Sequence, residues 1–443
     1  MNRAVVNVLT ALRNVDPIRR TGHITRFAGL TLESKGPATR LGELCEILPG
    51  GEGAASLAEV VGFTADSVLL LPYTDPQGLS VGAEVIATGR SAQVNVGEHL
   101  LGRVLDGFGA PLDGKPLPVA GQRCAIYPAP INPLQRGRTV DILETGIRAI
   151  DSLLTLARGQ RVGIFAGSGV GKSTVLGMIA REVQADVSVI ALVGERGREV
   201  QAFVEEGLTA AARSRSVIVA ATSDQPPLVR RRAAFLATAI AEYFRDRGQH
   251  VCLTMDSITR VAMAQREIGL ARGELPTARG YTPSVFTLLP RLLERGGVSA
   301  AGGSLTALYT VLVEGDDLSD PISDTVRSIL DGHIVLSRAV AQRGRYPAVD
   351  VTQSVSRLAT AVVAENDARL IAEAVRLLAV YESSRDLVEV GAYRDGTNPS
   401  LDRALRVMPE LEQFLAQKPT EVEKRAAAIA RLRKIIEAPG RAA

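Results

Sequence analysis

A glycine-rich stretch, FAGSGVGKST, covers residues 165–174 and follows an apolar run. It matches the phosphate-binding pattern G-x-x-x-x-G-K-[ST], except that Ala166 stands at the first glycine position. Glycines let backbone N–H groups turn toward phosphate oxygens, and the following helix presents its positive end. The stretch therefore predicts a nucleotide site in which Lys172 contacts the β- and γ-phosphates and Ser173 binds Mg²⁺. The other residues expected around the phosphates are Gly167, Ser168, Gly169, Val170, Gly171 and Thr174.

Acidic and basic residues that could complete such a site follow two other apolar runs. Asp256 ends VCLTMD and is a candidate for holding the metal ion, because P-loop enzymes place a carboxylate at the end of another strand. Glu195 ends VSVIALVGE and could position or deprotonate a water molecule. Arg196 and Arg260 lie close by in the sequence and could neutralise phosphate charge. Taken singly, the glycine-rich stretch could be an ordinary strand-to-helix turn, and the charged residues could be solvated.

The elements around these residues favour the phosphate site. From about residue 159, apolar runs alternate with helical stretches, which predicts a parallel sheet covered by helices. Ligands of such sheets bind outside the carboxyl ends of the strands. The expected strands are RVGIFA, VSVIALVGE, SVIVAATSD, HVCLTMD and LTALYTVLVEGDD. The candidate residues fall at the ends of these strands.

The rest of the chain divides by its pattern into flanking regions. Residues 1–20 predict an amphipathic helix, and the short β-branched runs of residues 21–92 predict a small β-barrel. Residues 101–118, rich in glycine and proline, predict a linker into a second domain, and the expected P-loop domain covers residues 93–365. Residues 366–443 have helical periodicity without strand signals, which predicts a helical domain.

The composition excludes several other classes of protein. The net charge of +3 over 443 residues is too small to indicate a nucleic-acid or membrane surface by itself. The three cysteines have no metal-ligand spacing, and their odd number does not suggest a disulfide framework. The N-terminus lacks the features of a secretory signal, and there is no run of about 18 apolar residues to span a membrane. We therefore expect a folded multidomain protein in a reducing compartment.

Five longer motifs together resemble the type III protein-export ATPases, which are relatives of the catalytic subunit of rotary ATP synthases. The similarity is greatest to the flagellar export ATPases and extends from about residue 20 to residue 420. It implies an α/β fold with a small β-barrel, a central RecA-like P-loop domain and a C-terminal helical domain. The motifs are GSGVGKST, GERGREV, MDSITRVAMAQREIGLARGELPTARGYTPSVF, EGDDLSDPISDTVRSILDGHIVLSR and RYPAVDVTQSVSR.

The resemblance also implies roles for single residues. Glu195 would be the general base for the attacking water, with Arg196 and Arg260 near the γ-phosphate. Arg357 in SVSR would be an arginine finger that reaches the site of the neighbouring subunit. Tyr346 in RYPAVD would pack on the adenine ring, although a tyrosine of the core is the alternative.

The resemblance further implies Mg²⁺-dependent ATP hydrolysis by a homohexamer that energises export of flagellar proteins from the cytoplasmic face of the membrane. Implied partners are the export gate, a stalk protein, chaperone–substrate complexes and a stator-like regulator. The N-terminal helix would dock to that regulator or, alternatively, pack on its own barrel. An injectisome ATPase and a subunit of a rotary synthase are the alternatives within the family. A hexameric nucleic-acid motor is a remote alternative, because residues 21–92 offer only Phe27, Phe63 and Tyr73 for stacking.

Overall fold

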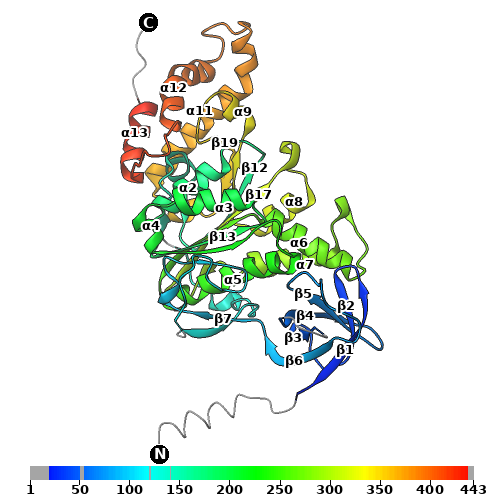
Figure 1. Cartoon of the computed structure of the whole chain (residues 1–443). Helices are drawn as coiled ribbons and strands as arrows, with labels where there is room; N and C mark the ends of the chain where they lie inside the picture. The colour runs from blue at the N-terminus through cyan, green and yellow to red at the C-terminus, as the bar shows by residue number, and fades with distance from the viewer. Residues whose placement is uncertain (1–18, 50–53, 119–120, 140, 438–443) are drawn as a thin grey trace, which may run out of the picture.

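The computed structural model contains a β-barrel, a central sheet with helices, and a C-terminal group of helices (Figure 1). These parts confirm the predicted fold class. The amphipathic helix predicted for residues 1–20 lies almost entirely outside the described part of the chain. The described residues are 19–49, 54–118, 121–139 and 141–437.

The barrel has six strands that close in the order β1-β2-β5-β4-β3-β6. Alternate side chains point inward, as the period of a strand requires, so that Ile24, Leu32, Ile47, Leu70 and Val85 form a buried core. Closure leaves the barrel without a free sheet edge. The strands are β1 (Thr21–Ala28), β2 (Thr31–Lys35), β3 (Glu43–Leu48), β4 (Ser56–Phe63), β5 (Val68–Pro72) and β6 (Glu84–Ser91).

A nine-stranded sheet lies at the centre, in the order β19-β18-β12-β17-β15-β13-β14-β8, with β16 beside β17. Strands β16 and β19 run antiparallel to their neighbours, and the other pairs are parallel. The carboxyl ends of β12, β13 and β15 therefore meet at one edge. The strands are β8 (Val104–Leu105), β12 (Arg161–Ala166), β13 (Val187–Val193), β14 (Ser216–Ala221), β15 (His250–Asp256), β16 (Gly297–Val298), β17 (Ser304–Leu312), β18 (Gly332–Leu336) and β19 (Val349–Ser356).

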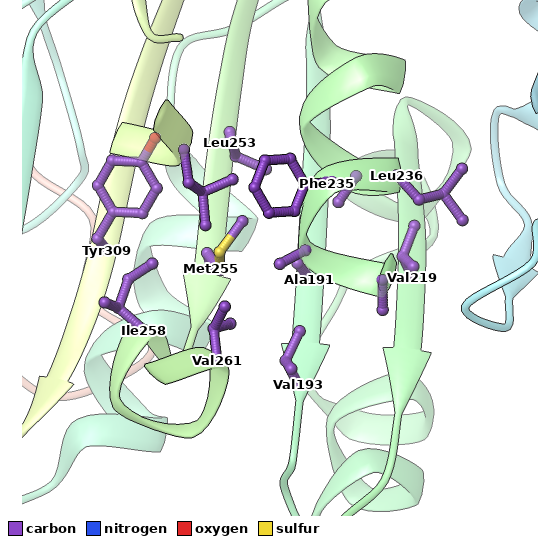
Figure 2. Packing of buried hydrophobic residues seen from close by; sticks show 14 of the residues in the cluster. Ala191, Val193, Val219, Phe235, Leu236, Leu253, Met255, Ile258, Val261 and Tyr309 are labelled. Atoms are coloured by element: carbon purple, nitrogen blue, oxygen red, sulfur yellow. The ribbon is translucent and has the colours of Figure 1, made fainter. Parts of the chain in front are cut away.

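Successive residues of a strand point to opposite faces of the sheet, so both faces carry side chains that need to be covered. Helices provide this cover. Figure 2 shows Phe235 and Leu236 packed near Leu253 and Val219 in the largest core cluster. The helices before the C-terminal group are α2 (Lys172–Glu182), α3 (Gly197–Glu206), α4 (Ala210–Ser214), α5 (Pro227–Arg245), α6 (Ile258–Ala271), α7 (Pro283–Leu293), α8 (Pro321–Ile329), α9 (Arg338–Gln342) and α10 (Ala359–Val362).

The C-terminal helices pack against β12 and α2, the strand and helix that flank the glycine-rich loop. Leu377, Leu411 and Leu432 are buried in one cluster together with Ile164 and Ile179. The helices are α11 (Glu365–Glu389), α12 (Pro399–Leu415) and α13 (Arg425–Glu437). Smaller elements are the pairs β7 (Gln93–Val96) with β9 (Gln122–Ala125) and β10 (Ile142–Leu143) with β11 (Leu156–Ala157), the 3-10 turns Glu98–Leu100, Pro133–Gln135, Ala278–Gly280 and Glu314–Asp316, and the π-helix Ile150–Leu154.

The interpretation of residues 101–118 as a linker alone was wrong. Val104 and Leu105 form β8 and pair in parallel with Ile218 and Val219 of β14 at the edge of the main sheet. The carboxylate of Asp106 closes the following turn by accepting hydrogen bonds from two backbone N–H groups. Glycine and proline produced the linker signal, whereas the pairing partner lies more than a hundred residues away in sequence.

Candidate active site

The glycine-rich stretch connects β12 to α2 at the carboxyl edge of the sheet. Gly169 and Gly171 have φ angles of +79° and +87°, which side chains other than glycine rarely adopt. Ala166, in contrast, is the last residue of β12, where it is buried and pairs with Leu312 and Leu336. Its methyl group therefore lies in the core and not in the loop. The single departure from the phosphate-binding pattern is structurally harmless.

Lys172, Glu195 and Asp256 form one ionic cluster at the end of this loop. The Lys172 Nζ atom donates to Asp256 Oδ1 at 2.6 Å and to Glu195 Oε1 at 3.2 Å. All three side chains are at most 13 % exposed, so solvent screens the charges weakly. Burial lowers the pKa of Lys172, but the two carboxylates outweigh it and raise the pKa above its ordinary value. The ammonium group is therefore charged at neutral pH.

Asp256 ends β15 and is held by a residue of the neighbouring strand. Thr310 Oγ1, on β17, donates to Asp256 Oδ1 at 2.6 Å. Burial raises the pKa of Asp256, and the Lys172 charge and the hydrogen bonds oppose that shift. Thr310 was not among the predicted site residues. A polar residue inside the apolar run LTALYTVL was the available signal, but its partner depends on β17 lying beside β15.

Glu195 follows Gly194 at the end of β13, and Arg260 packs against that turn. Gly194 has a φ of +72°, and a Cβ atom there would lie 2.8 Å from Arg260 Cβ. This close approach requires glycine and fixes Glu195 relative to Arg260. The Arg260 Nε atom is buried without a hydrogen-bond partner. The site thus holds a half-buried guanidinium with one unpaired N–H group that an anionic ligand could satisfy.

Lys172, Glu195 and Arg260 line one cavity of about 890 Å³ together with the glycine-rich loop. Asp256 instead lines another cavity, which shares Ser173 and Glu195 with the first. Arg196, predicted for the site, also lines the first cavity, but its side chain is 76 % exposed and lies 3.7 Å from Glu199. Three further cations line the first cavity and were not predicted, because arginine is common along the chain. They are Arg266, Arg279 and Arg338.

Tyr346 lies beside the glycine-rich loop and is not a residue of the core. Its side chain is 47 % exposed. A Cβ atom on Gly171 would lie 3.6 Å from its ring. Tyr346 also lines a second cavity, of about 730 Å³, with Arg148 and Gln417. This position suits a ring that packs on a nucleotide base.

Arg357 does not join the other predicted residues. Strand β19 runs antiparallel to β18, so that Val349 pairs with Leu336 at the loop end and Ser356 pairs with Gly332 at the opposite end. Arg357 follows Ser356 and is exposed. Because the six residues of β12 span about 16 Å, Arg357 is too distant to contact phosphates on its own loop.

Comparison with known proteins decides the family. Residues 146–356 match the nucleotide-binding domain of the ATP synthase alpha/beta family, residues 24–89 match its beta-barrel domain, and residues 363–434 match the T3SS EscN ATPase C-terminal domain. A flagellum-specific ATP synthase of Bacillus subtilis is 51 % identical over 96 % of this chain and 98 % of its own. The chain belongs to the type III export branch of the ATP synthase alpha/beta family. The resemblance seen in the motifs is thereby confirmed.

Other members of this ATP synthase alpha/beta family are similar over nearly the whole chain. A flagellum-specific ATP synthase of Treponema pallidum is 56 % identical over 92 % of this chain and 91 % of its own. The solved structure of the assembled ATPase EscN from enteropathogenic E. coli superimposes with a TM-score of 0.89 at 43 % identity, covering 94 % of this chain and 100 % of EscN. The chain is accordingly an ATPase of this family.

The oxygen donors at the site fit a Mg²⁺ ion that arrives with a nucleotide. Ser173, in the first turn of α2, and Asp256 line the cavity between α2 and α3 next to Glu195. Mg²⁺ is usually held by one or two protein oxygens plus substrate phosphates and not by a full protein cage. In the described part of the chain, no group of three or more His, Cys, Asp or Glu residues could hold a metal by itself. When bound, the ion would neutralise charge on the phosphates.

We expect Lys172→Ala to weaken ATP binding by about 10²-fold, because a charged hydrogen bond to the phosphates is lost. The substitution also leaves Glu195 and Asp256 without their shared cation, which adds repulsion toward phosphate. Equilibrium binding of labelled ATP measures the effect. Lys434→Ala, at an exposed position of α13, is the matched control. Equal affinity in the two variants would contradict a phosphate site at this loop.

Proposed function

We propose that the chain hydrolyses ATP with Mg²⁺ in a homohexameric ring and that turnover energises export of flagellar proteins through a type III secretion apparatus. The observation that supports this most is the cluster of Lys172, Glu195 and Asp256 at the carboxyl edge of the sheet. It joins a phosphate-binding cation, a carboxylate able to activate water and a carboxylate that would hold the metal ion. Arg260 would stabilise charge on the γ-phosphate, and Arg196 would lie beside it.

The position of Arg357 supports the proposed ring. An arginine finger must contact the transferring phosphoryl group, and this residue lies at the opposite end of β12 from its own phosphate loop. A neighbouring subunit of the same kind would supply the finger, so that each interface holds one complete site. EscN, a structural neighbour, has been solved in an assembled form and in complex with its central stalk EscO. We propose an equivalent ring and stalk partner here.

Other partners are proposed on the family resemblance. They are the export gate, chaperone–substrate complexes and a stator-like regulator, and the segment expected to bind that regulator lies outside the described residues. Within the described part of the chain, no helix is long and apolar enough to cross a membrane. We place the ring at the inner face of the cell membrane through these partners.

Specific observations bear on two alternatives. A type 3 secretion system ATPase of Xanthomonas euvesicatoria is 49 % identical, which falls within the range of 44–56 % for the flagellar relatives, so identity alone does not separate the two export systems. A nucleic-acid motor would need several aromatic side chains on the barrel surface for base stacking. Tyr73 is buried and hydrogen-bonded to Glu59, so only Phe27 and Phe63 of the three candidates are exposed.

Deleting the gene tests the flagellar assignment. We expect cells without filaments and without motility, restored by the wild-type gene but not by the Lys172→Ala gene. Motile mutant cells that retain filaments would contradict flagellar export. ATPase activity that depends strongly on added RNA would instead favour the nucleic-acid motor.

A further inference from the structure

A buried amide, that of Gln160, holds the backbone that carries Arg357. Gln160 directly precedes β12 and is fully buried. Its Oε1 atom accepts from the Ala157 N–H at 2.9 Å, and its Nε2 atom donates to the Asp331 carbonyl and to Ser356 Oγ, both at 3.1 Å. A fully bonded buried amide has a defined orientation, because any rotation leaves polar atoms unpaired.

Two of these contacts lead directly to Arg357. The Arg357 N–H donates at 3.0 Å to the Asp331 carbonyl, which is the same oxygen that accepts from Gln160. Ser356, the residue before Arg357, receives the second amide hydrogen bond and donates its own hydroxyl to the Thr155 carbonyl at 2.9 Å. Gln160 thus constrains the backbone immediately before Arg357 and the acceptor of its N–H group.

Asp331 is itself fixed, so that the network has a rigid anchor. Its carboxylate accepts from Arg161 Nε and Nη2 at 2.9 Å in a bidentate pair. In contrast, the Arg357 side chain is exposed, and its Nη2 atom reaches the Arg327 carbonyl only at 3.4 Å. The direction in which Arg357 leaves its subunit is therefore set by its backbone.

We propose that Gln160 is a positioning residue for the arginine finger Arg357, acting on the site of the neighbouring subunit. The inference rests on the proposed shared site. A displacement of about 1 Å in a group that contacts the transition state can reduce the rate about 10²-fold. Gln160 lies at the end of β12 opposite the phosphate loop, so its loss should leave ATP binding to its own subunit intact.

Gln160→Met keeps an unbranched side chain of similar length and removes the amide. We expect kcat to fall by about 10–10²-fold, with the KM for ATP changed by less than about threefold. Gln249→Met is the matched control, because Gln249 precedes β15 at the same edge of the sheet and its amide oxygen has no hydrogen-bond partner. A Gln160→Met variant as active as this control would overturn the proposal.

Mixed rings separate positioning of the finger from a general structural effect. In rings of Gln160→Met with Glu195→Gln, about a quarter of the interfaces join an intact Glu195 to an intact, correctly held Arg357. We expect activity to recover in this mixture. Rings of Gln160→Met with Arg357→Ala have a defective finger at every interface and should be no more active than Gln160→Met alone.

The other possible outcomes also distinguish between the proposal and its alternatives. If Arg357→Ala with Glu195→Gln recovers activity but Gln160→Met with Glu195→Gln does not, Gln160 acts on its own subunit and the proposal fails. If neither mixture recovers, the shared site itself is wrong. Should Gln160→Met not fold, as judged by circular dichroism, Ser356→Ala carries the same test. It removes the hydroxyl that Gln160 holds, and full activity in that variant would overturn the proposal.

Discussion

Arg357→Ala should bind ATP with nearly normal affinity and hydrolyse it about 10³–10⁵-fold more slowly. The finger neutralises charge that develops on the transferring phosphoryl group, and its loss raises the barrier by about 4–7 kcal/mol. Binding should persist because Arg357 lies at the opposite end of β12 from the phosphate loop of its own subunit. Labelled-nucleotide binding and steady-state phosphate release measure the two quantities on the same preparation.

Arg369→Ala is the control for this substitution. Arg369 is also exposed, and it pairs with Glu365 one turn earlier on α11, a type of surface pair that contributes little to stability. We expect its turnover to match the wild type. An Arg357→Ala turnover within about threefold of this control would exclude an arginine finger at that position, given the rate effect that fingers have.

Glu195→Gln should retain ATP binding and ring formation while turnover falls by about 10²–10⁴-fold. The amide keeps the shape of the side chain and an oxygen that can accept from Lys172, but it cannot take a proton from water. Binding and hydrolysis should therefore separate. Single-turnover hydrolysis and equilibrium binding of ATP, both measured on the Glu195→Gln variant, test this separation.

Glu205→Gln, at an exposed position of α3, controls for the loss of one negative charge near the site. It should hydrolyse ATP at the wild-type rate. If Glu195→Gln were equally active, the general base would have to be another group. If Glu195→Gln instead lost ATP binding, the carboxylate would serve to hold Lys172 and not to activate water.

The core of the site could be predicted because its chemistry follows local rules. Lys172 and Ser173 belong to one short pattern, and Glu195 and Asp256 each end an apolar strand. In a parallel sheet such ends meet at one edge, so the strand pattern was sufficient to bring these residues together. The structure places Lys172 within hydrogen-bond distance of both Glu195 and Asp256.

The remaining features of the site and the fold could not be predicted, because they depend on which strands lie side by side in the sheet. Thr310 contacts Asp256 because β17 is inserted between β12 and β15, an order that periodicity does not reveal. Val104 and Leu105 in β8 escaped prediction for the same reason, since two residues among glycines and prolines have no strand pattern of their own. The role of Gln160 could not be predicted either, because its partners Asp331 and Ser356 are distant in the sequence and meet it only in the folded chain.

Sharing of each site between two subunits is the central claim, and mixing two inactive variants tests it most directly. Purified Arg357→Ala and Glu195→Gln should each be almost inactive, for different reasons. In co-assembled rings, about a quarter of the interfaces combine an intact Glu195 with an intact Arg357, so activity should rise well above that of either variant alone. Demonstrably mixed rings that stay as inactive as the parents would contradict action of Arg357 on the neighbouring subunit.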